Sequence, residues 1–75
     1  MYKYQFFRDG HTVNIYDYIV VCATCDGRRR VKVEAETYAE AEKYARNIIA
    51  NLDPWLDSHG KIVPVYAERV QPKMV

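Results

Sequence analysis

Two cysteines three residues apart are the side chains of this sequence with the most distinctive chemistry. Cys22-Ala-Thr-Cys25 precedes Asp26-Gly27, an order typical of one half of a zinc ribbon. A complete site needs four ligands, and the chain has no second cysteine pair, while His11 and His59 lie far from this one. We therefore keep zinc binding by Cys22 and Cys25 as the least favoured of three functional alternatives.

Redox chemistry is a weaker interpretation of the same pair. A reactive Cys-x-x-Cys pair uses a helix N-terminus to lower its thiol pKa, whereas these cysteines come before a β-turn. Along an extended strand three residues span roughly 10 Å, beyond the roughly 7 Å limit on Cα separation for a disulfide. We expect two reduced thiols, one of them buried.

The run Arg28-Arg29-Arg30-Val31-Lys32 is the strongest local concentration of charge. In a strand, alternation sends Arg28, Arg30 and Lys32 to one face, about 6.6 Å apart. Arginine suits bidentate contacts to carboxylate or phosphate. Glu34 and Glu36 continue the row with the opposite sign. A solvated strand face, a contact with a protein partner and a nucleic-acid surface therefore all remain open.

Seven tyrosines accompany these cations. Tyrosine and arginine are enriched at interaction hot spots, and tyrosine rings also stack on bases in RNA-binding sheets. We place Tyr44 in the core and expect Tyr18 and Tyr66 to lie on strands beside the basic row. No aromatic RNA-binding signature is present. The predicted partner-binding residues are Arg28, Arg30, Lys32, Tyr18 and Tyr66.

Catalysis is not indicated by the histidines. His11 falls in a predicted turn, and His59 follows Ser58 in a predicted loop. Sequence neighbours rarely have the geometry of a nucleophile and its base, and a short chain builds a deep cleft with difficulty. We expect a protein that is not an enzyme and that needs no cofactor.

Length and composition limit the architecture. The chain has 75 residues, 49% of them hydrophobic and 28% charged, which suits one globular domain over residues 1–75. A net charge of +1 gives no overall attraction to a polyanion. No apolar run approaches the roughly 20 residues of a membrane span, and the start lacks the apolar stretch of a signal peptide. We expect a cytoplasmic protein without membrane contact.

A helix from Tyr38 to Leu52 is the clearest predicted element. Thr37 is a suitable N-cap and Glu40 completes a capping box, while Pro54 ends the helix at Asp53. The apolar positions recur at helical spacing and predict a buried face made of Ala41, Tyr44, Ala45, Ile48, Ile49 and Leu52.

Alternating polar and apolar residues predict two hairpins before this helix. The first turns at Asp9-Gly10, and the second joins Tyr16–Thr24 to Arg28–Ala35. For the second turn we prefer a three-residue loop, Cys25-Asp26-Gly27, which sets Val21 opposite Val31 and Ile19 opposite Val33. A two-residue loop, Asp26-Gly27, would instead set Cys22, Val20 and Tyr18 opposite Val31, Val33 and Ala35. Either register points Val31, Val33 and Ala35 inward and the basic row outward.

The remaining chain completes a small α+β fold. Pro54–Gly60 is predicted to be a loop, with one helical turn that begins at Asp53 as the alternative, and Trp55 and Leu56 are predicted to plug the helix end. Lys61–Val70 is predicted to be a strand that Pro64 confines to a sheet edge. The expected order is β-β-β-α-β, with a small antiparallel sheet of about four strands and one helix on one face.

This layout, with the capped helix that begins Glu36-Thr-Tyr-Ala-Glu-Ala-Glu-Lys-Tyr-Ala45, resembles small accessory proteins of phages and mobile elements, anti-CRISPR proteins among them. The resemblance implies an inhibitor that binds a host nucleoprotein defence complex through an exposed sheet face. We thus expect a protein or ribonucleoprotein partner, direct nucleic-acid binding by the same strip being the alternative. In isolation the chain should be a monomer or a weak homodimer.

Overall fold

The computed structural model describes residues 2–71 and contains four strands and two helices. The strands are β1 (Tyr4–Arg8), β2 (His11–Thr24), β3 (Gly27–Ala35) and β4 (Val63–Val70). The helices are α1 (Tyr38–Leu52) and α2 (Pro54–His59). The predicted α+β fold with order β-β-β-α-β is confirmed.

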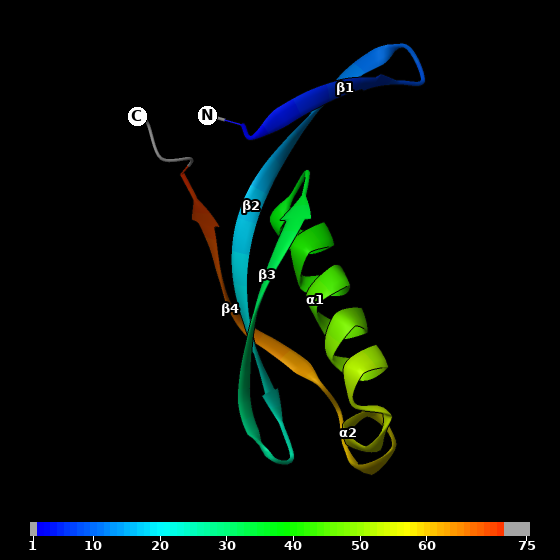
Figure 1. Ribbon diagram of the computed structural model, residues 1–75, viewed down its shortest axis with the longest axis vertical. Coiled ribbons are helices and arrows are strands. Elements are labelled where there is room, and N and C mark those ends of the chain that lie inside the picture. The colour runs from blue at the N-terminus through cyan, green and yellow to red at the C-terminus, as the bar shows by residue number, and fades with distance from the viewer. Residues whose placement is uncertain (1, 72–75) are drawn as a thin grey trace.

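The long strand β2 organises the sheet because every other strand pairs with it in antiparallel fashion (Figure 1). Its residues 11–15 pair with β1, its residues 16–24 pair with β3, and residues 17–23 pair with β4 as well. The β1–β2 hairpin therefore extends past the three-stranded part of the sheet. In Figure 1 the hairpin curves over the end of α1 that carries its first turn.

Helix α1 covers one face of the β3-β2-β4 sheet, and its ends agree with the prediction. The Thr37 hydroxyl accepts a hydrogen bond from the Glu40 amide, and the Glu40 carboxylate accepts one from the Glu36 amide. Ala41, Ala45 and Ile49 are buried, and their small or slender side chains let the helix lie close to the sheet. The buried cluster is formed by Tyr18, Val20, Cys22, Val33, Ala35, Ala41, Ala45, Ile49, Leu56 and Ile62.

The prediction that Tyr44 and Leu52 of α1 belong to the core is wrong. Leu52 is 78% exposed and Tyr44 is 39% exposed. The sheet contacts only a narrow stripe of the helix, so residues at the margins of the predicted apolar face reach solvent.

The segment after α1 forms the six-residue helix α2 with Asp53 at its N-cap, which agrees with the predicted alternative of a helical turn rather than with a loop. Pro54 stands in the first turn of α2, where its missing amide hydrogen costs no bond. Leu56 is 1% exposed and seals the core as predicted, whereas Trp55 is 55% exposed and does not. Trp55 stacks instead on His59, one turn further along α2, with the ring centroids 4.3 Å apart.

The second hairpin has neither of the predicted registers. Thr24 pairs with Gly27, so the turn consists of Cys25 and Asp26, and Val21 lies opposite Arg30 rather than Val31. The preferred assignment of Ile19 and Val21 to the helix-covered face is wrong as well. The outward direction of Arg28, Arg30 and Lys32 is confirmed, because the alternate residues Val33 and Ala35 are buried.

Among residues 2–71 the longest helix, α1, has 15 residues, and none is long and apolar enough to cross a bilayer.

Candidate interaction surface

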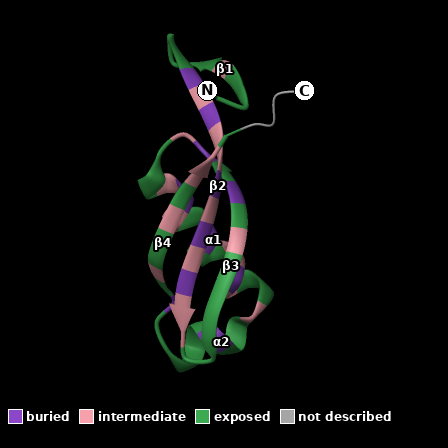
Figure 2. Ribbon diagram, turned by 90° about the vertical axis from the view of Figure 1, so that its left-hand side faces the viewer, coloured by how far each residue is buried: buried purple, intermediate pink, exposed green. Residues whose placement is uncertain are grey.

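The face of the β3-β2-β4 sheet that α1 leaves uncovered is here called the open face. Figure 2 looks onto it, with α1 behind the strands. Its side chains alternate with those of the core, so the register assigns its members. The open face consists of Asp17, Ile19, Val21 and Ala23 from β2, Arg28, Arg30, Lys32 and Glu34 from β3, and Val63, Tyr66, Glu68 and Val70 from β4.

Cross-strand pairing arranges these side chains in rows with a mixed chemistry. Val21 lies between Arg30 and Tyr66, and the next row places Ile19 between Lys32 and Glu68. Directly opposed residues lie about 4.5–5.5 Å apart at Cβ, so each cation neighbours an aliphatic side chain. The centre of the open face is thus an apolar strip, with a cationic margin on β3.

Strand β4 adds an exposed apolar margin. A register shift between Val21 and Cys22 leaves Val65 without a partner on β2, as expected for a bulge. Val63, Val65 and Tyr66 are 45%, 48% and 54% exposed. Three adjoining apolar side chains of this size, left in solvent beside a half-buried strip, are typical of an interaction surface.

Arg28, Arg30 and Lys32, the cationic row, form no ion pair within the described part of the chain. The acidic residues at the end of the same face are paired. Lys3 Nζ lies 2.6 Å from Glu34 Oε2 and 3.3 Å from Asp17 Oδ1. The cationic row is therefore free for an external anionic group, while the neighbouring carboxylates are already neutralised.

Tyr4 strengthens this neutralisation by donating its hydroxyl to Glu34 Oε1 over 3.0 Å. The hydrogen bonds from Lys3 and then from Tyr4 hold the pKa of Glu34 below its ordinary value. The same contacts raise the pKa of Lys3, with the bond to Glu34 as the largest cause and the bond to Asp17 next. The segment before β1 thus acts as an anchor at one end of the open face.

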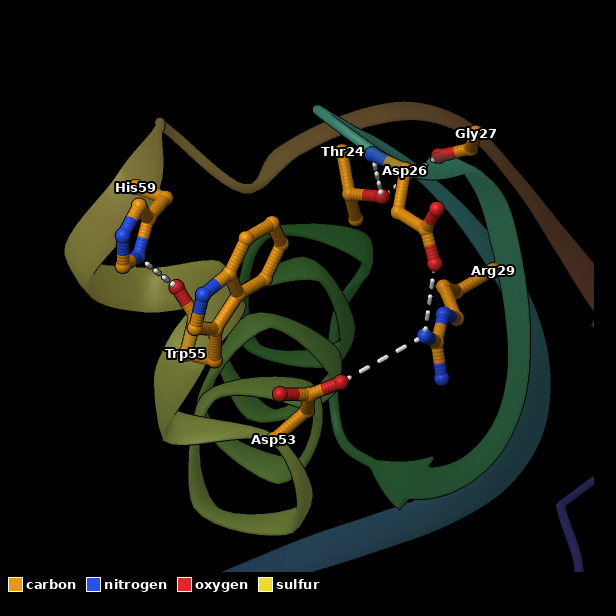
Figure 3. A network of polar contacts seen from close by, with 7 residues as sticks. All are labelled: Thr24, Asp26, Gly27, Arg29, Asp53, Trp55 and His59. Carbon is orange, nitrogen blue, oxygen red and sulfur yellow. Dashed lines mark hydrogen bonds and ion pairs between the residues drawn. The ribbon is translucent and has the colours of Figure 1, made fainter.

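Arg29, unlike the two arginines that flank it, forms ion pairs, which Figure 3 shows. Its guanidinium lies 3.5 Å from Asp26 in the turn and 3.5 Å from Asp53 between α1 and α2. Within the turn, the Thr24 hydroxyl donates to the Gly27 carbonyl over 2.6 Å. Arg29 therefore ties the β2–β3 turn to the helices, a structural role that the run of arginines did not reveal.

Four of the five predicted site residues lie together on the open face, namely Arg28, Arg30, Lys32 and Tyr66. The prediction for Tyr18 is wrong, because its side chain is fully buried on the opposite, helix-covered face. Its hydroxyl accepts hydrogen bonds from Arg69 at 2.7 and 3.2 Å, and Arg69 also lies 3.7 Å from the ring centre of Tyr16. This arginine caps the aromatic edge of the core.

The alternation in β2 predicts an apolar set of residues on each face of the sheet, but the set chosen for the open face is wrong. Ile19 and Val21 were assigned to the core because the preferred register reversed the two faces of β2. Tyr18, Val20 and Cys22 form an equally apolar set with the opposite parity, so alternation alone does not decide which set faces the helix.

The remaining chemical candidates of the sequence do not form a site. Both cysteines are free, with Cys22 in the core and Cys25 exposed, and burial raises the pKa of the Cys22 thiol. Within residues 2–71 no group of three or more potential ligands is placed to hold a metal. His59 Nδ1 lies 2.9 Å from both Ser58 Oγ and the Trp55 carbonyl, contacts that belong to the last turn of α2.

A groove of about 200 Å³ lies between the β1–β2 hairpin and the first turns of α1. Val13, Ile15 and Tyr44 contribute its apolar lining. Arg8 lines the same groove as three glutamates, of which Glu34 is paired with Lys3. These opposing charges favour no single class of ligand. The β1–β2 hairpin that lines the groove lies at the opposite end of the molecule from α2 (Figure 1).

The sequence matches no protein-family model, and comparisons with curated proteins and with solved structures yield no significant relative.

Proposed function

We propose that this protein is a non-enzymatic binding module whose open face docks onto an acidic and partly apolar surface of a protein partner. The observation that carries the proposal is the unpaired cationic row beside the strip of Ile19 and Val21 and the exposed Tyr66. Apolar burial would supply affinity, and the cations would select the partner and orient it.

A nucleoprotein complex is the proposed source of that partner. This step rests on the resemblance of the layout to phage accessory proteins that inhibit such complexes. The partner would present carboxylates to the cationic row, so we place the contact on a protein subunit.

Direct binding of nucleic acid is the second candidate, and the roughly 6.6 Å spacing of the cationic row favours it because neighbouring phosphates are similarly spaced. The centre of the open face opposes it. A sheet that binds bases presents aromatic rings for stacking, whereas Ile19, Val21 and Ala23 occupy this centre and Tyr66 is the one ring on the face.

Capture from a host lysate by charge-reversed variants tests the first candidate. The test variant combines Arg28→Glu with Arg30→Glu, and the control combines Lys43→Glu with Lys61→Glu, which changes net charge equally on exposed positions outside the open face. Quantitative mass spectrometry should show one protein set retained by the wild type and the control and reduced at least about tenfold by the test variant. Equal retention by both variants would refute the open face as the interface.

A salt titration separates the two candidates. With labelled single- and double-stranded oligonucleotides we expect no saturable binding below about 100 μM protein at low salt. Micromolar binding would favour nucleic acid instead if it depends strongly on salt. The logarithm of the association constant should then fall with a slope of about −2 to −3 against the logarithm of the salt concentration, because three cations release counterions from the phosphates.

A further inference from the structure

The outer edge of β3 is free for pairing. Within the described residues β3 pairs with β2 alone, while α1 packs on the face of the sheet rather than along this edge (Figure 2). Gly27 to Arg30 are all exposed. An exposed edge strand offers backbone groups that another extended chain can bind.

The register identifies which backbone groups point outward. A two-residue turn is closed by a hydrogen-bonded pair, here Thr24 and Gly27, and pairs with and without such bonds alternate along an antiparallel ladder. Arg28, Arg30 and Lys32 thus stand in non-hydrogen-bonded pairs with β2. Residues in such pairs direct their N–H and C=O groups to the other side of their strand, which is the free edge.

The residues with outward backbone groups are therefore the same residues that carry the cationic row. A strand added at this edge would place its residues directly opposite Arg28, Arg30 and Lys32, with side chains on the open face. Carboxylates at alternate positions of the added strand would each meet one cation, at the matching repeat of about 6.6 Å. Backbone pairing and charge complementarity thus select the same ligand.

A second copy of this chain is a poor occupant of the edge. Antiparallel pairing of two β3 strands about Arg30 would set Arg30 against its symmetry mate and Arg28 against Lys32. Like charges directly opposite each other destabilise a sheet, and cations on edge strands prevent such self-association. The cationic row therefore rejects its own copy and accepts an acidic strand.

We propose that the partner contributes an extended segment with Asp or Glu at alternate positions, which adds to the outer edge of β3 as a further strand of the β3-β2-β4 sheet. This inference rests on the proposed function, because it assigns the anionic part of the partner to a strand that continues the open face. Ile19, Val21 and Tyr66 remain available for the rest of the partner.

Backbone methylation of a synthetic peptide tests the edge. The probe is a labelled seven-residue peptide, blocked at both ends, in which four threonines alternate with three glutamates. The glutamates would stand opposite the cationic row with their amides directed at β3, and the threonine amides would point away. Methylation of the three glutamate nitrogens should weaken binding at least tenfold, whereas methylation of three threonine nitrogens, the matched control, should change it less than threefold.

Amide exchange in the protein supplies a second readout. Binding of the unmodified peptide should slow exchange of the Arg28, Arg30 and Lys32 amides and leave Val31 and Val33 unchanged, because the latter amides already bond to β2. Equal binding of the two methylated peptides would overturn edge pairing and leave the open face as a charged surface. Failure of the unmodified peptide to bind would also overturn it, whereas the proposed function fails separately if the charge-reversed and control variants capture the same proteins.

Discussion

The two faces of the β3-β2-β4 sheet are built from alternate residues of the same strands, yet they have opposite properties. On the covered face Tyr18, Val20 and Cys22 are fully buried against α1. On the open face Ile19 and Val21 are only half-buried and adjoin free cations. Neighbouring residues of one strand therefore serve separate purposes, stability on one side and recognition on the other, which substitutions can separate.

Adjacent valines of β2 give the largest expected contrast. Val20→Asp would bury an unpaired carboxylate in a site with no exposed surface, a cost of several kcal/mol that is comparable with the total stability of a small domain. Val21→Asp places the same group on the open face and should leave the protein folded. Thermal melting followed by circular dichroism should show a cooperative transition for the second variant alone; equal melting of both would refute the assignment of the faces.

Two leucines near the ends of the helices provide the next contrast. Leu56 is 1% exposed and Leu52 is 78% exposed. Leu56→Ala should lower the free energy of unfolding by about 2–5 kcal/mol, since it leaves a cavity in the core. Leu52→Ala should change it by less than about 0.5 kcal/mol. Urea denaturation measures both free energies of unfolding. A loss above about 1 kcal/mol for Leu52→Ala would show that the buried face of α1 is wider than the structure indicates and includes Leu52.

The helix could be predicted from the sequence residue for residue, whereas the hairpin register could not. The cap at Thr37 and the stop at Pro54 are local signals. The dipeptide Asp-Gly is not decisive in the same way. In the first hairpin Asp9-Gly10 forms the turn, with φ of 51° and 79°, whereas Gly27, with φ of 110°, follows the turn of the second. The burial of Tyr18, Val20 and Cys22 against α1 excludes the preferred register, which turns the alternate residues of β2 toward the helix.

The candidate site, like the fold, was predictable from the sequence only where the prediction does not depend on the hairpin register. Alternation within β3 predicted the cationic row, because it holds whatever the register. The exclusion of Tyr18 and the inclusion of Ile19 and Val21 depend on the register, so sequence reasoning reversed them. The contact of Lys3 with Glu34 joins residues far apart in the chain, and no local pattern indicates it.

The neighbouring arginines of β3 should separate recognition from stability at smaller cost. Arg30→Glu should remove binding of the alternating peptide and change the melting temperature by less than about 5 °C. Arg29→Ala removes the contacts with Asp26 and Asp53, both partly exposed, and should cost about 0.2–1 kcal/mol without weakening peptide binding. A larger fall in melting temperature for Arg30→Glu would show that Arg30 supports the fold and is not reserved for a partner.

The smallest expected effect is the loss of the ion pair between Lys3 and Glu34, here called the anchor, when either side chain changes its protonation state. Because the folded protein lowers the pKa of Glu34 from its ordinary value of 4.5, the anchor is fully stabilising above pH 4.5 and is lost as pH falls through the lowered pKa. The raised pKa of Lys3 means that the same contact is complete below its ordinary value of 10.5 and is lost as pH rises through the raised pKa. Lys3→Ala should therefore move the midpoint of the Glu34 carboxyl titration, followed by NMR, upward toward 4.5, whereas Lys43→Ala should not. Identical midpoints in the two variants would mean that Lys3 does not neutralise Glu34, and Glu34 would then compete with an acidic partner for the cationic row.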